Sequence, residues 1–309
     1  MTLRTAAWVH HPERSNMFML RLMTWISLRL GRNIARVVLH GIAVYFLLFA
    51  PSARRASRQY LRRALGRTPH LRDLYRHFFT FATAIHDRVY LVNQRFDLFD
   101  FEVRGEDILH RLLAENHGLL LMGAHLGSFE VIRALARKDT DFCVAMVMHE
   151  DNAQKINAIL AAINPQLVPD IIGLGHIDSM LKVNARLDEG SIIGILADRT
   201  IGHDALQPVQ MLGATAYLPS GPFRMAALLR RPVLFMTGLY LGGNRYAIHF
   251  DTLADFSNVA RGQRDAAVQA ALQRYAVLLD QYCRQAPYNW FNFFDFWQAA
   301  TPTGTIVKS

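Results

Sequence analysis

The sequence predicts an α/β fold, with a mostly parallel central sheet flanked by helices and a helical, membrane-associating N-terminal extension. From residue 97 onward, short apolar runs of strand length alternate with segments of helical periodicity, which is typical of parallel strands joined by helices. Residues 1–96 show helical spacing alone. No proline- or glycine-rich linker separates this extension from the α/β domain at 97–309, so the two are expected to form one continuous structural unit.

The extension is both basic and apolar. Helices are expected over residues 17–30, 34–50, 51–67 and 71–92. The first 80 residues carry fourteen arginines and only two carboxylates, a net charge of +12, whereas the rest of the chain has a net charge of −3. Basic arms suit nucleic acids, anionic lipid headgroups or acidic proteins.

The apolar residues of the extension favour a membrane among these partners. Bulky aliphatic and aromatic side chains between the arginines are typical of a helix lying in a bilayer interface, with the arginines at phosphate level. The longest apolar run, residues 37–50, is shorter than the roughly 20 residues that a spanning helix needs. A peripheral or monotopic association is therefore expected, and nucleic-acid binding is disfavoured.

The α/β domain is expected to begin at residue 97. The composition, 51% hydrophobic and 19% charged, excludes disordered and collagen-like chains and supplies a sizeable core. Strands are predicted at residues 99–103, 119–122, 142–148, 168–172, 191–196, 233–240 and 245–250, which are short apolar runs. Helices are predicted at residues 107–116, 128–137, 152–163, 178–187, 219–229 and 260–284.

A histidine follows one predicted strand at a position suited to chemistry. The apolar run at 119–122 leads through Gly123 and Ala124 to His125, and Glu130 follows in the next helix. Ligands of α/β sheets bind at the carboxyl ends of strands, where His125 is placed. A carboxylate beside a histidine holds its tautomer and stabilises the imidazolium, so His125 is a candidate general base.

Spacing argues against other catalytic motifs. Ser128 lies in A-H-L-G-S-F-E rather than G-x-S-x-G, so no nucleophile elbow is present. His125 and Glu130 do not form H-E-x-x-H, and no second histidine stands at metal-ligand spacing, so no metal site is expected. Neither G-x-x-x-x-G-K nor G-x-G-x-x-G supports a nucleotide cofactor.

The segment G-A-H-L-G-S-F-E resembles the signature of the bacterial lipid A late (secondary) acyltransferases, within the wider lysophospholipid acyltransferase-like superfamily. That signature is H-x-x-x-x-D/E, with a glycine two residues after the histidine and an aromatic residue before the acid. Its places are filled here by His125, Gly127, Phe129 and Glu130. Weaker similarity extends to residues 193–200 (I-G-I-L-A-D-R-T), to residues 208–233, which resemble a loop, helix and apolar strand of the family, and to the aromatic tail, residues 287–297. The resemblance thus covers about residues 100–297.

The resemblance implies transfer of an acyl group from an acyl thioester to a hydroxyl of a glycolipid or other lipidic acceptor. The donor would be carried by acyl carrier protein or coenzyme A, and no cofactor is implied beyond this co-substrate. His125 would act as general base, oriented by Glu130 or by Asp198, and the sequence leaves both carboxylates open. Arg199 is a candidate for binding a substrate phosphate, since arginine suits bidentate phosphate contacts.

Further substrate-binding candidates lie at the helix predicted for 219–229. Backbone N–H groups near Ser220 and Gly221 could hold a phosphate or an oxyanion, and Arg224 lies on the same helix. The basic extension fits two partners, an anionic membrane surface and an acidic carrier protein. The expected location is the cytoplasmic face of the bacterial inner membrane, because arginine-rich flanks are retained on that side.

Two alternatives stay open for the same residues. An esterase or thioesterase would use His125 to activate water instead of an acceptor hydroxyl. A catalytically silent module would keep the fold and bind only a membrane or a carrier protein, although an intact His125 and Glu130 pair argues against this.

Overall fold

The central element of the molecule is a mixed, mostly parallel sheet. The computed structural model describes residues 17–115, 118–132, 143–164, 166, 170–175, 177–199 and 205–297. Within these residues, seven strands form the sheet in the order β1-β9-β8-β2-β5-β3-β4. Its strands are β1 (Asp100–Arg104), β2 (Leu119–Gly123), β3 (Val144–His149), β4 (Ile171–Leu174), β5 (Ile192–Leu196), β8 (Pro232–Gly242) and β9 (Arg245–Asp255). The predicted α/β fold is confirmed.

Five neighbouring strands of the sheet run in the same direction. Strands β8, β2, β5, β3 and β4 are parallel, β9 returns antiparallel to β8, and β1 pairs in parallel with β9. Every residue of β2 is buried, and alternate side chains enter different cores: Leu120 and Met122 join one apolar cluster, Leu119 and Leu121 another. Helices cover both faces of the sheet, which explains the continuous apolar run in this strand.

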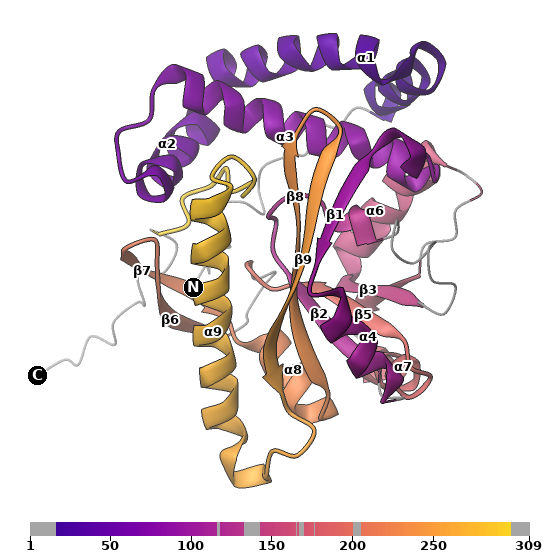
Figure 1. Cartoon of the computed structure of the whole chain (residues 1–309), viewed down its shortest axis with the longest axis vertical. Coiled ribbons are helices and arrows are strands. Elements are labelled where there is room, and N and C mark those ends of the chain that lie inside the picture. Colours follow the sequence, from indigo (N-terminus) through magenta and orange to yellow (C-terminus); the bar gives the residue numbers. More distant parts are fainter. Residues whose placement is uncertain are drawn as a thin grey trace, which may run out of the picture.

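Eight α-helices in the described residues surround the sheet (Figure 1). They are α1 (Met17–Phe49), α2 (Pro51–Leu65), α3 (Leu71–Val92), α4 (Glu106–Ala114), α6 (Glu150–Ile163), α7 (Ile177–Asp188), α8 (Gly221–Leu229) and α9 (Arg264–Gln285). The helix predicted over 128–137 is represented by the short 3₁₀ turn η2 (Phe129–Val131), and residues 133–137 lie outside the described part. The first residues of the strand predicted over 168–172 also lie outside it.

A small hairpin occupies the stretch before α8, where the resemblance implied a loop, so that expectation was wrong. Strands β6 (Leu206–Met211) and β7 (Ala214–Pro219) pair antiparallel across a two-residue turn at Leu212 and Gly213. Both turn residues have positive φ, as a type I′ turn requires. Alternate residues of the two strands are buried, but the runs are short and each contains a proline, which obscures the pattern in the sequence.

Helix α1 is one helix with a kink at Gly31, whose φ of 84° and ψ of 166° are not helical. The two helices predicted over 17–30 and 34–50 are its two halves. In Figure 1, α1 crosses the top of the molecule above α3. Its buried positions carry small or polar side chains and one leucine. They lie three or four residues apart within each half of the helix: Thr24 and Ser27 before the kink, and Ala35, Leu39 and Ala43 after it.

The outer face of α1 is bulky and apolar, the reverse of a helix that covers a soluble core. Its exposed large side chains are Trp25, Leu28, Leu30, Ile34, Val37, Val38, Val44, Tyr45, Phe46, Leu48 and Phe49. Contiguous exposed apolar surface of this kind marks an interaction site. Thr24–Phe49 is also the one segment in the described residues that is long and apolar enough to cross a membrane.

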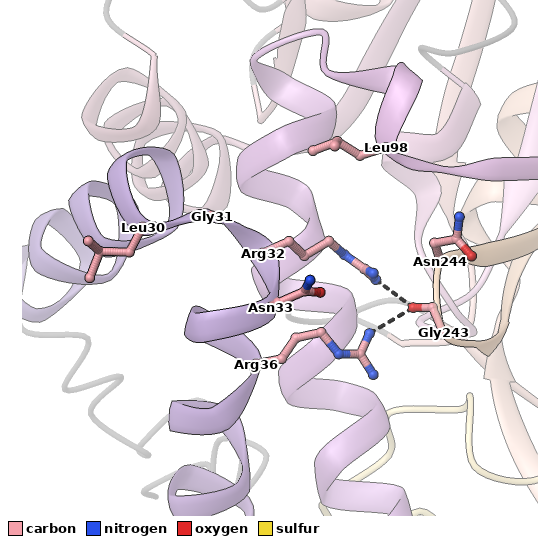
Figure 2. A pocket seen from close by; sticks show the side chains of 8 residues that line it. All are labelled: Leu30, Gly31, Arg32, Asn33, Arg36, Leu98, Gly243 and Asn244. Carbon is pink, nitrogen blue, oxygen red and sulfur yellow. Dashed lines mark hydrogen bonds between the residues drawn. The ribbon is translucent and has the colours of Figure 1, made fainter.

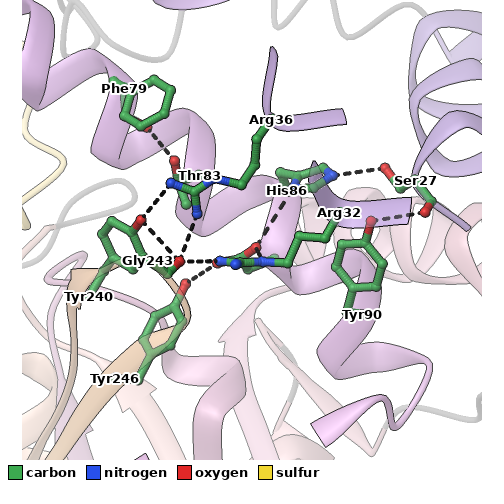
Figure 3. A network of polar contacts seen from close by, with 11 residues as sticks. Ser27, Arg32, Arg36, Phe79, Thr83, His86, Tyr90, Tyr240, Gly243 and Tyr246 are labelled. Carbon is green, nitrogen blue, oxygen red and sulfur yellow. Dashed lines mark hydrogen bonds and ion pairs between the residues drawn. The ribbon is translucent and has the colours of Figure 1, made fainter. Parts of the chain in front are cut away.

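Polar contacts on the inner side of α1 fix it to the rest of the protein (Figure 3). The Arg32 guanidinium donates to both carboxylate oxygens of Asp87 on α3, each at 2.8 Å. Arg32 and Arg36 both donate to the carbonyl oxygen of Gly243 at the tip of the β8–β9 hairpin, at 2.7 Å (Figure 2). The Tyr90 hydroxyl donates to the Ser27 carbonyl at 2.9 Å. The apolar face of α1 is therefore held outward.

Candidate active site

His125 and Asp198 meet at the carboxyl ends of two adjacent parallel strands. Gly123 at the end of β2 pairs with Leu196 at the end of β5, and His125 and Asp198 each follow two positions later. The His125 Nδ1 atom lies 2.8 Å from Asp198 Oδ1, and the His125 backbone N–H donates to Asp198 Oδ2 at 3.1 Å. The parallel register therefore places both side chains at one edge of the sheet, as expected for an α/β site.

The contact with Asp198 determines the tautomer of His125. An ionised carboxylate only accepts hydrogen bonds, so Nδ1 carries the proton and donates it to Oδ1. The lone pair on Nε2 is then available to accept a proton. The Asp198 side chain is fully buried, whereas 36% of the His125 side-chain surface is exposed. The His125 side chain is therefore partly accessible while its partner stays shielded from solvent.

The charges around the pair favour an ionised Asp198 and a neutral His125. Burial would raise the pKa of Asp198, but His125, Arg199 and the Trp290 indole N–H together hold it well below its usual range. Burial lowers the pKa of His125, and the positive charges of Arg199 and Arg88 lower it further, against the opposing effect of Asp198. At neutral pH the imidazole is a free base beside a carboxylate.

The two carboxylates that the sequence left open have different neighbours. Asp198 is hydrogen-bonded to His125, whereas Glu130 in η2 has its Oε1 atom 3.8 Å from Nε of Arg88 on α3. Asp198 is therefore the carboxylate that contacts the His125 ring in the structure, and the catalytic roles of both carboxylates stay predictions. Glu130 lies instead beside Arg88, whose positive charge lowers the pKa of His125.

Arg199 lies beside the pair and is held by the aromatic tail. Its Nη2 donates to the Phe291 carbonyl at 2.6 Å, and its guanidinium stacks 5.0 Å from the Phe294 ring centre. Its Nε lies 4.0 Å from Asp198 Oδ2. A phosphate-binding role for Arg199 stays a prediction.

The candidates on α8 make their side-chain contacts elsewhere. Ser220 precedes α8 and its hydroxyl donates to the Ala205 carbonyl at 3.0 Å, and Gly221 is the first residue of the helix. Nη1 of Arg224 lies 3.6 Å from the exposed Asp265 carboxylate. These contacts do not connect the α8 residues to His125, and their substrate-binding roles stay predictions.

The aromatic tail supplies a site residue that the sequence did not single out. Residues 289–291 run beside the His125 segment, where the Gly127 N–H donates to the Asn289 carbonyl and the Phe291 N–H donates to the His125 carbonyl, both at 2.8 Å. The Trp290 indole N–H donates to Asp198 Oδ2 at 3.0 Å. Arg88 was also missed, because nothing in its local sequence relates α3 to the strand ends.

Comparison with known proteins adds one finding. The model of the bacterial lipid A biosynthesis acyltransferase family matches residues 5–299, a range that includes the helices of the extension as well as the whole sheet. No curated protein matches the sequence significantly. Among the described residues, no group of three or more His, Cys, Asp or Glu side chains is arranged to hold a metal ion.

Proposed function

The chain belongs to the bacterial lipid A biosynthesis acyltransferase family, and we propose that it moves an acyl group from a thioester to a lipidic hydroxyl with His125 as general base. The observation that carries the role of His125 is the 2.8 Å contact between its Nδ1 and Asp198 Oδ1, which leaves Nε2 free. The family match supplies the class of reaction, and the His125–Asp198 pair supplies a base suited to it.

The proposed reaction needs only these two side chains for its proton transfers. Nε2 of His125 takes the proton of the acceptor hydroxyl while the oxygen attacks the thioester carbonyl. The tetrahedral intermediate collapses, the carbon–sulfur bond breaks, and the imidazolium returns the proton to the departing thiolate. Asp198 stabilises the imidazolium between these steps, as the aspartate of a serine-protease triad does. The products are the acylated acceptor and the free thiol of the carrier.

The donor and the acceptor are proposed from the positive charges of the chain and from the class of reaction that the family catalyses. Both acyl carrier protein and acyl-coenzyme A present a thioester on a phosphate-bearing arm, and Arg199 beside the base could contact an anionic group of donor or acceptor. A lipid A precursor is the acceptor that the family implies, and a related glycolipid hydroxyl would suit the same chemistry. The arginine-rich extension supports binding of an acidic carrier and of anionic lipid.

Helix α1 is proposed to lie in the cytoplasmic leaflet of the inner membrane rather than to cross it. The helix packs lengthwise against α3 through small buried side chains, and its bulky side chains point away from α3. Arg32 and Arg36 lie near the middle of the apolar segment and bond to α3 and to the β8–β9 hairpin. In a spanning helix these charges would enter the hydrocarbon, at a cost of about 2.5–3.5 kcal/mol each.

The test compares lipid extracts of cells producing the wild-type protein, His125→Ala or His110→Ala. His110 is an exposed histidine on α4, so its replacement is a matched control. Mass spectrometry should show one lipid class losing a single acyl mass only in His125→Ala cells. Full acylation with His125→Ala would refute the base assignment. Donor thioester consumed by purified protein without an acylated product would instead indicate a hydrolase, and no His125-dependent turnover would indicate a binding module.

A further inference from the structure

Trp290 lies between the helical extension and the candidate site and forms a hydrogen bond on each side. Its side chain is fully buried. On one side its indole N–H donates to Asp198 Oδ2 at 3.0 Å, and on the other its carbonyl oxygen lies 2.8 Å from Nε2 of His77 on α3. The second nitrogen of the His77 ring lies 2.8 Å from the hydroxyl of Ser57 on α2. A continuous buried chain of contacts thus runs from α2 to His125.

We propose that His77 is a positioning residue for the acyltransferase reaction, and that it acts through Trp290 by fixing the carboxylate of Asp198 against His125. The inference rests on the proposed function, because one of its tests measures acyl transfer. The contacts themselves do not depend on which acyl acceptor is used.

The chemistry of each partner sets the direction of every hydrogen bond in the chain. A carbonyl oxygen only accepts, so Nε2 of His77 carries the proton that it donates to Trp290. Nδ1 of His77 is then an acceptor, and the Ser57 hydroxyl donates to it. Burial lowers the pKa of His77 to about 4, so the ring is neutral at physiological pH. In this neutral tautomer both ring nitrogens are satisfied.

The carboxylate at the end of the chain depends on its donors for its orientation. One oxygen of Asp198 accepts from the His125 ring, and the other accepts from the His125 backbone and from the Trp290 indole. Losing the indole contact would let the carboxylate rotate about its last bond. Because buried carboxylates need their donors, such a rotation weakens the stabilisation of the His125 imidazolium.

Packing and hydrogen bonding at His77 can be separated by substitution. The ring also packs against Tyr60 and Phe293, at centroid distances of 5.4 and 4.7 Å. His77→Phe keeps an aromatic ring but cannot donate to the Trp290 carbonyl. His77→Gln has a smaller packing surface, but its amide can donate to that carbonyl and accept from Ser57. If His77 acts through packing alone, His77→Phe should retain more activity than His77→Gln. The proposed role predicts the opposite order.

The experiment measures acyl transfer and the pKa of His125 in the purified full chain, in wild type, His77→Phe, His77→Gln and Thr83→Val. Thr83 is a buried α3 residue whose hydroxyl bonds within its own helix, so Thr83→Val is the packing control. His77→Phe should lower kcat about tenfold at unchanged KM, the scale of one buried hydrogen bond. It should also lower the pKa of His125 measured by nitrogen-15 NMR, and His77→Gln should restore both.

The expected pKa change follows from the groups that face His125. Asp198 raises its pKa, whereas Arg199 and Arg88 lower it, so a loosened Asp198 leaves the arginines dominant. Equal losses in His77→Phe and His77→Gln, or an unchanged His125 pKa in His77→Phe, would overturn the proposal. If His77→Phe does not fold, Ser57→Ala gives the same test with the ring in place, with a smaller shift in the same direction. The NMR measurement needs no substrate, so its result is separate from failure of the proposed function, which the His125→Ala assay detects.

Discussion

Arg32 and Asp87 form a bidentate ion pair between α1 and α3, with both nitrogen–oxygen distances at 2.8 Å. The Asp87 side chain is fully buried, and only 11% of the Arg32 side-chain surface is exposed. The same carboxylate accepts a hydrogen bond from the Tyr246 hydroxyl of β9 at 2.8 Å. One carboxylate therefore links the apolar surface helix, the helix beneath it and the sheet.

Replacing Asp87 should destabilise the protein strongly. Asp87→Asn leaves a buried guanidinium uncompensated, and breaking a buried pair in this way costs about 3–5 kcal/mol. The control is Asp97→Asn, whose partner Arg95 is exposed, and such surface pairs contribute about 0–1 kcal/mol. Denaturant unfolding in detergent measures both free energies. Equal changes in the two variants would show that the pair between α1 and α3 does not stabilise the fold.

Removing the two candidate carboxylates should affect turnover unequally. Asp198→Asn keeps the shape of the side chain but can no longer hold the His125 tautomer or balance the imidazolium. A rate loss on the order of 10³–10⁴-fold is expected, by analogy with serine-protease triads. Glu130→Gln should lower kcat much less, because the structure pairs Glu130 with Arg88. The comparison is contradicted by a Glu130→Gln loss as large as that of Asp198→Asn.

The activity should fall at acidic pH, with a midpoint at the pKa of His125, which lies below 6.5. Only the neutral imidazole can take a proton, and burial together with Arg199 places the pKa of His125 below its usual 6.5. Asp198 stays ionised over this range because its own pKa is far lower. The profile of kcat/KM against pH should therefore be flat near neutrality and decline through the His125 pKa.

Arg199→Gln provides a check on the sign of this pH dependence. Removing a positive charge beside His125 stabilises the imidazolium, so the acid limb should move to higher pH. A limb that stays in place or moves to lower pH would mean that Arg199 does not set the basicity of His125.

A charge on the outer face of α1 should release the protein from lipid. Val37 is 69% exposed on this face, and Val37→Glu puts a carboxylate where apolar contact with the bilayer is proposed. Val277→Glu on α9, where the native side chain is 53% exposed, is the matched control. Flotation with vesicles containing anionic lipid should show weaker binding for Val37→Glu alone. Equal binding of both variants would place the membrane contact elsewhere.

Local patterns predicted the seven strands of the central sheet and the position of the histidine, but not the β6–β7 hairpin. The apolar run before Gly123 indicated a buried strand, and the strand before Asp198 was equally clear, so both side chains could be placed at strand ends. The pairing between them depends on β2 and β5 being neighbours in register, which periodicity along one strand does not reveal. For this reason the sequence left Glu130 and Asp198 as alternatives.

Contacts that depend on the path of the tail could not be predicted. Trp290 lies 92 positions after Asp198 and 213 after His77, and no local pattern relates the three. The three residues come together because a few residues of the tail pair with the His125 segment, including the isolated bridge between Leu126 and Trp290. The orientation of α1 could not be predicted from the sequence either. Small and bulky residues are interspersed along this helix, and only its packing shows which face is covered.

The position of Trp290 in the chain also sets an order of events during synthesis. Every strand of the sheet precedes this residue, and α1 precedes every strand. At about 5–20 residues per second, Trp290 follows Phe49 by on the order of ten to fifty seconds. The nascent chain therefore has time to make the proposed contact of α1 with a bilayer before the last donor to Asp198 exists, so the proposed membrane attachment can precede completion of the candidate site.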